Sequence, residues 1–331
     1  MAAPEIIVVG AGVAGLSCAS ELARAGRRVA VWTAAPPEQT TSMVAAAFWH
    51  PYRAGPIEQV GPWAVVSYER FASLAADLTL GPRAGVFMRD AIELYPQPQP
   101  DPPWARHVDM FRHAVPEELP PGYGHGIVFE APVIDMSRYL PWMVAQLRRL
   151  GVEIVIRRLD SLAPALADAD AKVVVNCTGL GARELVGDSS LYPVRGQVVR
   201  CTRDGLEQVV LDEHDEQGIS YIIPRGEDVV LGGVAEDYDE DLRERPEQTA
   251  AILKRCTRLV PALANTTVLG ARVGLRPCRD RVRLEAEELA CEAGDRLIVH
   301  NYGHGGAGVT LSWGCAEEVR ERVSAWLTAR R

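Results

Sequence analysis

A glycine-rich turn that directly follows a buried strand constrains the fold of this chain more than any other feature. Residues 6–9 (IIVV) are uniformly apolar, as in a strand that is buried on both faces of a parallel sheet. The sequence GAGVAG follows at 10–15, and a helical pattern runs to Gly26 before a second apolar segment at 29–32. The first glycine permits a tight turn, the second lets a pyrophosphate approach the backbone, and the third lets helix and strand pack closely. The pattern predicts a βαβ unit that binds a dinucleotide.

The acidic residue that usually binds a ribose in such a unit is missing. The second strand is followed by Thr33, Ala34 and Ala35, and the nearest acid, Glu38, is displaced along the chain. The missing acid argues more strongly against a nicotinamide dinucleotide than against FAD as the ligand, because FAD is longer and has further contacts with its protein. How the ribose is held stays open.

Two later segments suit a ligand as long as FAD. The strand expected at residues 173–176 ends in a turn of small residues at 177–179, which brings backbone close to a ligand lying across the sheet edge. A second glycine-rich turn, at 303–308, opens the last helix, expected over about 309–327. The N-terminal dipole of that helix would stabilise negative charge, such as that of a reduced flavin. An ordinary strand-ending turn is the alternative for residues 177–179.

Composition and charge exclude several classes of protein. The 331 residues carry 35 basic and 44 acidic side chains, a net charge of −9, which argues against nucleic acid or an anionic membrane as main partner. The seven cysteines are scattered without a CxxC pair, as expected for reduced thiols rather than a disulfide framework or a zinc site. No apolar run reaches the roughly 18 residues of a membrane span, and neither a signal peptide nor a peroxisomal signal is recognised. We expect a cytoplasmic protein without a bound metal.

Two kinds of segment alternate along the chain, one with parallel α/β character and one with antiparallel β character. The simplest interpretation is an α/β FAD-binding Rossmann-like domain, built from discontinuous segments, plus an interleaved α+β substrate-binding domain with an antiparallel sheet. The FAD-binding domain would comprise residues 1–50, 135–185 and 265–331, and the substrate-binding domain residues 51–134 and 186–264. Further helices are expected near residues 63–78 and 137–150, the second capped by Asp135 or Ser137.

The C-terminal glycine turn lies in a block that is similar to the signature of D-amino-acid oxidases. Residues 299–311 read VHNYGHGGAGVTL, and Trp313 and Gly314 follow. Shorter blocks resemble the same family: VAAAFWHPY at 44–52, NCTG at 176–179, YIIP at 221–224 and GLRP at 274–277. The resemblance covers essentially the whole chain.

The resemblance implies an enzyme that binds FAD non-covalently and oxidises D-amino acids. Hydride transfer from Cα to flavin N5 would give an imino acid, which water converts to a 2-oxo acid and ammonia, while oxygen reoxidises the flavin and yields hydrogen peroxide. By position, Tyr221 and Arg276 would hold the substrate carboxylate, and the carbonyl of Gly306 would accept a hydrogen bond from the amino group. The residues expected to contact FAD are Gly10, Ala11, Gly12, Val13, Ala14, Gly15, Thr40, Thr41, Ser42, Ala46, Ala47, Phe48, Leu159, Thr178, Arg276, Gly305, Gly306, Ala307, Gly308, Val309 and Thr310.

The chemistry of a carboxylate supports the role of Arg276 independently. A planar carboxylate is bound best by a bidentate fork, which an arginine supplies and a lysine does not. Tyr221 lies in an apolar strand, where a place in the core is the alternative, and His304 lies in a turn, where we expect a structural role. No acid or base side chain is required, since the cofactor carries the chemistry and the protein orients the substrate.

By the resemblance, the segment 211–220 (LDEHDEQGIS) corresponds to the active-site lid of the family. We use its residues to predict which substrates the enzyme accepts. Gln217 stands where a second tyrosine is common, and Ala235 is small, so we expect a roomy pocket for neutral or varied side chains. Four acidic residues in the lid would repel a substrate with an acidic side chain, namely Asp212, Glu213, Asp215 and Glu216.

Other functions stay open. A D-aspartate or D-glutamate oxidase would need a second cation for the side-chain carboxylate, for which Arg225 could be recruited. A glycine or sarcosine oxidase is a further alternative, as is a dinucleotide-binding protein that is no oxidase, either a nicotinamide dehydrogenase or a catalytically silent module. The expected partners are a D-amino acid and molecular oxygen; a homodimer is one possibility, and the sequence does not settle the oligomeric state.

Overall fold

The first sheet is built around the strand that precedes the glycine turn. The computed structural model describes residues 3–168, 170–290 and 294–330, so that Cys291 and Arg331 lie outside the described residues. The six strands follow the order β14-β15-β7-β1-β2-β6, and all pairs are parallel except β14 with β15. Their bounds are β1 Ile6–Val9, β2 Val29–Thr33, β6 Glu153–Ile156, β7 Val173–Asn176, β14 Arg283–Leu289 and β15 Arg296–Tyr302.

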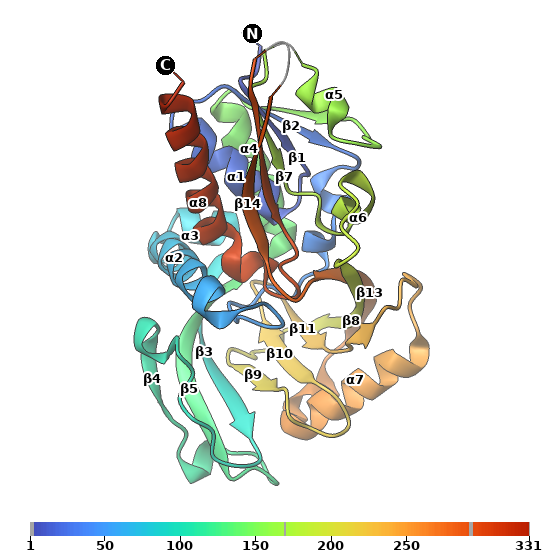
Figure 1. Ribbon diagram of the computed structural model, residues 1–331. Coiled ribbons are helices and arrows are strands. Elements are labelled where there is room, and N and C mark those ends of the chain that lie inside the picture. Colours follow the sequence, from blue (N-terminus) through green and yellow to red (C-terminus); the bar gives the residue numbers. More distant parts are fainter. Residues whose placement is uncertain (1–2, 169, 291–293, 331) are drawn as a thin grey trace.

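Both faces of this sheet are covered, which explains why its strands are apolar throughout. Ile6 and Val8 pack with residues of the helices on one face, whereas Ile7 and Val9 pack with Leu162 and Ala165 on the other. Helix α1 contacts α4 and α8 on the first face, and α2 packs on α8 (Figure 1). The helix bounds are α1 Val13–Arg24, α2 Ile57–Ala76, α3 Leu80–Ala84, α4 Met136–Arg149, α5 Ala163–Leu166, α6 Ala182–Leu185, α7 Pro246–Leu259 and α8 Gly308–Thr328.

The second sheet has nine strands and lies below the first in Figure 1. Its order is β12-β8-β11-β10-β9-β3-β5-β4, with β13 also paired to β8 and α7 packed against β8, β10 and β11. All pairs are antiparallel except β3 with β9. The bounds are β3 Val86–Tyr95, β4 Asp109–His113, β5 His125–Ile134, β8 Tyr192–Thr202, β9 Val209–Asp212, β10 Ser220–Pro224, β11 Asp228–Gly232, β12 Glu236–Asp237 and β13 Val268–Cys278.

The predicted fold class is confirmed by these two sheets, one rich in parallel strands and one mostly antiparallel. The expected cap of α4 is present as well, since the side chain of Asp135 accepts a hydrogen bond of 3.0 Å from the backbone N–H of Ser137. Strand β13 belongs to the second sheet, although the sequence analysis grouped the whole of it with the FAD-binding segment 265–331. The division into two domains stays a prediction. Among the described residues, every helix is too short or too polar to cross a membrane.

Candidate active site

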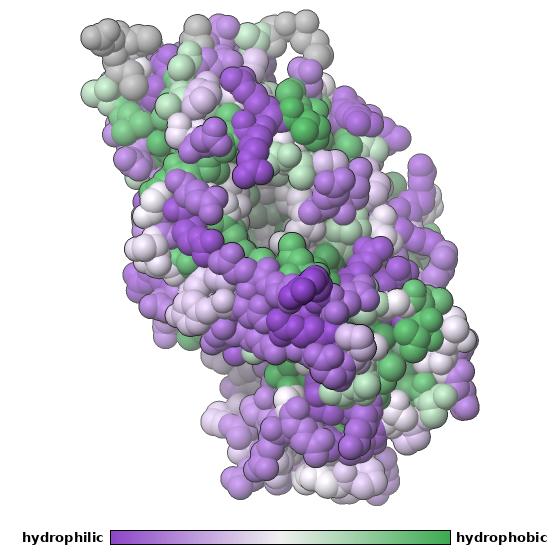
Figure 2. All heavy atoms as spheres, turned by 90° about the vertical axis from the view of Figure 1, so that its right-hand side faces the viewer, coloured by the Kyte–Doolittle hydropathy of each residue, from purple (hydrophilic) through white to green (hydrophobic). Residues whose placement is uncertain are grey.

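A cavity of about 800 Å³ lies where the carboxyl ends of the parallel strands meet the second sheet. It is lined by the segments that follow β1, β2 and β7, and by side chains of β8, β10 and β13. Figure 2 shows a hollow in one face of the molecule, with hydrophilic residues around much of its rim. In doubly wound folds, the carboxyl ends of parallel strands are the usual place for a bound dinucleotide.

The three glycines of the first turn have different structural roles. Gly10 has a φ of +111°, and a Cβ there would lie 2.4 Å from the carbonyl oxygen of Cys177. A Cβ on Gly15 would lie 1.9 Å from the carbonyl oxygen of Gly10, so this glycine serves close packing of helix and strand. Gly12 lines the cavity in an ordinary backbone conformation, and its Cβ would lie 3.1 Å from Ser42 Oγ. The middle glycine therefore keeps the wall of the cavity open to a ligand.

The loop after β2 closes over the start of α1. The hydroxyl of Ser42 accepts a hydrogen bond of 3.0 Å from the backbone N–H of Val13, the first residue of that helix. Thr40 and Thr41 line the cavity beside it. A turn of hydroxyl side chains and a helix N-terminus together form a cradle suited to a pyrophosphate.

Arginines line the cavity near the end of β2, where the expected acid is missing. Arg157 and Arg158 follow β6, the neighbour of β2, and both line the cavity. The guanidinium carbon of Arg157 lies 4.1 Å from the centre of the Trp32 ring, within the range of a cation–π contact. Of this segment only Leu159 was predicted, from the resemblance; Arg157 and Arg158 were not, because they follow a strand about 120 positions after β2.

The second glycine turn packs against the segment around Tyr52. Gly303 and Gly305 have φ values of +81° and +55°. A Cβ on Gly305 would lie 1.9 Å from the carbonyl oxygen of Arg53, and one on Gly306 would lie 2.5 Å from Cδ1 of Tyr52. Glycine is therefore required here by contact with a segment about 250 residues earlier in the chain.

Most of the predicted ligand-binding residues line this one cavity, but two do not. Gly15 is packed between the first turn and β7, and Ala307 is fully buried. The other predicted residues line the cavity, namely Gly10, Ala11, Gly12, Val13, Ala14, Thr40, Thr41, Ser42, Ala46, Ala47, Phe48, Leu159, Thr178, Tyr221, Arg276, Gly305, Gly306, Gly308, Val309 and Thr310.

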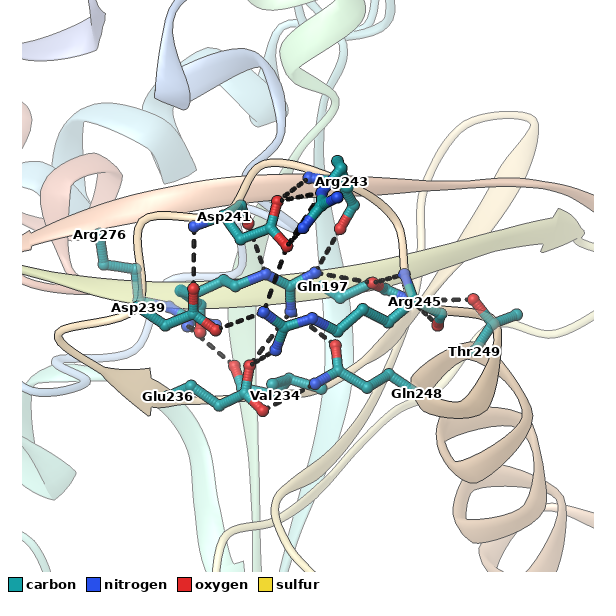
Figure 3. A network of polar contacts seen from close by, with 11 residues as sticks. Gln197, Val234, Glu236, Asp239, Asp241, Arg243, Arg245, Gln248, Thr249 and Arg276 are labelled. Atoms are coloured by element: carbon teal, nitrogen blue, oxygen red, sulfur yellow. Dashed lines mark hydrogen bonds and ion pairs between the residues drawn. The ribbon is translucent and has the colours of Figure 1, made fainter.

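Arg276 projects from β13 over a glycine of the neighbouring strand. A Cβ on Gly196 would lie 2.5–2.8 Å from three guanidinium atoms of Arg276, so the guanidinium rests directly on the backbone of β8. Its Nη1 donates to the carbonyl oxygen of Val234 at 2.9 Å and approaches that of Arg195 at 3.4 Å (Figure 3). One side of the guanidinium is thus anchored to backbone.

Two tyrosines accompany Arg276. A Cβ on Gly232 would lie 1.9 Å from the ring of Tyr221, and one on Gly233 would lie 2.5 Å from it. The ring therefore packs directly on the backbone of these two glycines, the last residue of β11 and the residue that follows it. The ring centre of Tyr52 is 5.8 Å from the guanidinium carbon of Arg276. Burial raises the pKa of both phenols although the charge of Arg276 opposes the shift. Both hydroxyls are therefore neutral near pH 7.

Arg195, whose carbonyl oxygen lies 3.4 Å from Nη1 of Arg276, has a fully buried side chain. Its guanidinium donates to the carbonyl oxygens of Asp241 at 2.6 Å and Arg243 at 2.7 Å, and Nη1 lies 3.2 Å from a carboxylate oxygen of Glu236 (Figure 3). The remaining bonds go to the side chains of Gln248 at 2.6 Å and Gln197 at 3.1 Å. The network fastens the loop of residues 236–245 and the start of α7 to β8.

Replacing this buried arginine should weaken the folded state. In Arg195→Met the stem is kept but buried carbonyls lose their donors, so we expect the free energy of unfolding to fall by about 3 kcal/mol. Urea unfolding measures the change. Arg243→Met is the matched control, because that side chain is 88% exposed and its solvent-screened ion pair with Asp241 should contribute little to stability. Equal losses in the two variants would contradict a structural role of the network.

His304 is placed as a structural residue. It is 4% exposed, and its Nε2 lies 2.9 Å from the side-chain oxygen of Asn301. Burial lowers the pKa of His304 to about 4, so the ring is neutral near pH 7. The prediction that this histidine is structural agrees with its position.

A charge cluster that we call the His50 cluster, formed by His50, Glu93 and Glu213, lies at the lid side of the cavity. His50 Nε2 is 3.4 Å from a carboxylate oxygen of Glu93, and Nδ1 is 3.5 Å from one of Glu213. Burial alone would lower the pKa of His50, but the two carboxylates outweigh it and raise that pKa to about 9. His50 and Glu213 line the cavity, whereas Glu93 lies behind them on β3.

The four lid acids have different surroundings. Asp212 is fully buried, accepts from the hydroxyl of Tyr123 and from the backbone N–H groups that follow it, and belongs to the core. Asp215 pairs with Arg258 on α7, and Glu216 is exposed to solvent. Glu213 alone among these four lines the cavity. The charge that a substrate meets is therefore smaller than the sequence indicated.

Arg225 cannot serve as the second cation of a D-aspartate site. It is 4% exposed, and its guanidinium donates to both carboxylate oxygens of Asp228 at 2.8 and 2.6 Å. Asp135 lies 3.7 Å away on its other side, and Arg225 does not line the main cavity. The sequence analysis missed this bidentate pair, although the two residues are only three positions apart.

Tyr52 and His50 were not predicted as site residues. Both lie in the segment 44–52 that resembles the oxidase family, so the signal for them was the block itself rather than their residue types. Thr310 holds this segment in place, because its hydroxyl donates to the carbonyl oxygen of His50 at 2.9 Å and accepts from the N–H of the same residue at 3.1 Å. The contact spans 260 positions of sequence.

Known proteins share this sequence and this fold. Residues 5–322 match the family described as FAD dependent oxidoreductase. The chain is 49% identical to a D-amino-acid oxidase of Rubrobacter xylanophilus, over 97% of this chain and 96% of that protein, and 42% identical to a D-amino-acid oxidase of Streptomyces coelicolor, over 97% of each. It is 35% identical to the D-aspartate oxidase of Homo sapiens, over 99% of this chain and 96% of that protein.

Solved structures share the fold at much lower sequence identity. The glycine oxidase of Geobacillus kaustophilus superposes with a TM-score of 0.77 at 18% identity, covering 96% of this chain and 95% of that one. The glycine oxidase of Bacillus cereus gives a TM-score of 0.75 at 17% identity, covering 98% and 95%. At such identities the likeness concerns the fold alone.

Proposed function

Because this chain belongs to the D-amino-acid oxidase family of FAD dependent oxidoreductases, we propose that it oxidises D-amino acids to 2-oxo acids, with release of ammonia and reduction of oxygen to hydrogen peroxide. The observation that carries the proposal is the convergence of Arg276, Tyr221 and Tyr52 in the cavity that the glycine turn after β1 also lines. The preferred substrates are neutral D-amino acids of varied size.

The cavity fits the cofactor of the family, which is FAD. The glycine turn with Ser42 would hold the pyrophosphate, and the N-terminus of α8 with its preceding glycines would face the flavin. A side chain on Gly12 would narrow this cradle, which supports its use for a ligand. When bound, FAD supplies the electron-accepting group of the oxidation.

The protein itself binds and orients the substrate. Arg276 presents the part of its guanidinium that is not anchored to Val234 and Arg195, and it would take the substrate carboxylate together with the hydroxyl of Tyr221. The carbonyl oxygen of Gly306 would accept a hydrogen bond from the amino group. Glycines beneath Arg276 and Tyr221 hold both side chains against backbone, so little rotamer freedom is lost on binding.

A peroxide assay over a panel of D- and L-amino acids tests the proposal directly. The purified protein should be yellow, with a flavin absorbance near ~450 nm. It should form peroxide with D-amino acids and not with their L-enantiomers. A protein that binds FAD but forms no peroxide with any D-amino acid would refute the proposed function.

A D-aspartate oxidase is the second candidate, since such an enzyme of Homo sapiens is a relative. We expect D-aspartate to be oxidised at least about tenfold less efficiently than D-asparagine in kcat/KM, because Glu213 lines the cavity and Arg225 is paired elsewhere. The ratio of kcat/KM for D-glutamate to that for D-glutamine is the control for the length of the substrate side chain. A higher kcat/KM for D-aspartate than for D-asparagine would favour the rival.

We also propose a cytoplasmic location. The described cysteines are all buried free thiols: Cys18, Cys177, Cys201, Cys256, Cys278 and Cys315. Free thiols are typical of a reducing compartment. Fractionation of cells that produce the protein tests this location, and recovery outside the cytoplasm would contradict it.

A further inference from the structure

The His50 cluster lies in the same chamber as the groups proposed to bind the substrate. The negative charge of Glu213 contributes to raising the pKa of Tyr52, so the two side chains are close enough to interact. Tyr52 in turn lies beside Arg276. Glu213 also follows Leu211, which pairs with Tyr221 between β9 and β10, by two residues, so it belongs to the substrate end of the cavity.

The charges within the His50 cluster do not balance. His50 carries one positive charge near pH 7 and has a carboxylate against each ring nitrogen. Glu93 is buried behind His50, and its Oε2 has no hydrogen-bond partner apart from the long contact of 3.4 Å with that ring. One positive charge thus serves two carboxylates, and the second of them, Glu213, is the one that lines the cavity.

Two other charged groups near Glu213, Arg53 and His214, have their direct contacts elsewhere. Arg53, on the same side, forms an ion pair of 2.5 Å with Asp237. His214 lies in the lid next to Glu213, with its ring centre 5.2 Å from that of Tyr95. Burial raises the pKa of Glu213; the charge of His50 opposes this shift, Glu93 adds to it, and His214 and Arg53 oppose it to a smaller extent.

Apolar side chains lie in the cavity wall around the cluster. Phe48, Leu211 and Ile223 line the cavity, and each is less than 8% exposed. Such a wall can cover the methylene stem of a long side chain, while the charged end reaches a carboxylate. A substrate held by Arg276 through its carboxylate would meet an acidic group at the side-chain end.

We infer, resting on the proposed function, that Glu213 is a specificity-determining residue that recruits D-amino acids with a cationic side chain, such as D-ornithine, D-lysine and D-arginine. The Glu213 carboxylate pairs with the side-chain cation, and Arg276 pairs with the α-carboxylate. Glu93 and His50 are positioning residues that keep Glu213 turned to the cavity. The inference extends the substrate range beyond the neutral D-amino acids proposed above.

The test compares a cation with its uncharged isostere. The measured quantity is the ratio of kcat/KM for D-lysine to that for D-2-aminoheptanoate, in which a methyl group replaces the ammonium. In Glu213→Gln this ratio should fall at least about tenfold, which corresponds to ~1.4 kcal/mol. Glu213→Asp keeps the charge and should restore most of the ratio. Glu216→Gln, which removes an exposed acid of the same lid, should change the ratio less than about twofold.

Binding without turnover separates this inference from the proposed function. We expect 6-aminohexanoate, which has no α-amino group to oxidise, to bind the wild-type holoprotein more tightly than heptanoate, as measured by perturbation of the flavin absorbance. Tighter binding of heptanoate, or an unchanged D-lysine ratio in Glu213→Gln, would overturn the inference. If neutral D-amino acids are not oxidised either, the proposed function has failed, and the comparison of the two acids still decides the role of Glu213.

Discussion

Arg276→Ala should retain FAD and lose at least roughly a thousandfold in kcat/KM for D-amino acids, by the conversion of ~1.4 kcal/mol per factor of ten. The guanidinium and a substrate carboxylate would form a charge-assisted bidentate pair in a desolvated site, which contributes about 2–5 kcal/mol. The variant also loses the fixed orientation of the substrate that makes the reaction effectively unimolecular. The side chain lies on Gly196 and donates to backbone carbonyls, so its removal leaves no carboxylate without a partner.

Two further variants make this expectation specific. Arg276→Lys should recover only part of the loss, because an ammonium keeps the attraction but not the planar fork. Arg272→Ala removes an exposed arginine from the same strand, outside the cavity, and should leave kcat/KM nearly unchanged. Steady-state kinetics with D-alanine measures all three. Near wild-type turnover in Arg276→Ala would mean that this arginine is structural and that the proposed substrate site is wrong.

Gly12→Val should lose bound FAD. The backbone at Gly12 has a φ of −71°, which any residue adopts, so the substitution adds volume without forcing the chain into a strained conformation. Its Cβ would lie 3.1 Å from Ser42 Oγ and would project into the cradle proposed for the pyrophosphate. We expect FAD affinity to fall at least about a hundredfold, equal to ~2.8 kcal/mol. The thermal midpoint should then respond little to added FAD.

The flavin content of the purified variant, read from its absorbance, measures this loss. Gly124→Val is the matched control, because that glycine is exposed and a Cβ there would meet no atom within 4 Å. It should keep its full complement of FAD. A Gly12→Val protein with as much flavin as the wild type would contradict the placement of the pyrophosphate. Gly15→Val would be uninformative, since its Cβ would collide with the carbonyl oxygen of Gly10.

Local rules predicted those parts of the protein that depend on neighbours in sequence. The apolar run Ile6–Val9 was predicted as a strand with both faces buried, and β1 has these bounds with no exposed residue. Asp135 or Ser137 was predicted as the cap of α4, and in the structure the side chain of Asp135 accepts from the backbone N–H of Ser137. Hydrophobic period, capping and glycine spacing act within a few residues, so they can be recognised in one sequence.

Other features depend on contacts between distant segments, and these were not predicted. Four lid acids looked equivalent in sequence, yet Asp212 is buried beneath Tyr123 and only Glu213 of the four lines the cavity. Arg225 was considered as a partner of an acidic substrate, but it pairs with Asp228 across a turn and also lies 3.7 Å from Asp135, which is 90 positions earlier in the chain. The direction in which a side chain points cannot be inferred from its charge or residue type, because it depends on the strand and helix packed beside it.

The sequence by itself determined the class of ligand and the residue types that could bind it, because a pyrophosphate needs a glycine turn and a carboxylate needs an arginine fork. Only the tertiary structure decided the shape of the site. Gly196 lies on β8, 80 positions before Arg276, and the first glycine turn lies about 180 positions further back. Sheet pairing and the packing of the two sheets bring these segments to one cavity, and no rule that acts over a few residues specifies such distances.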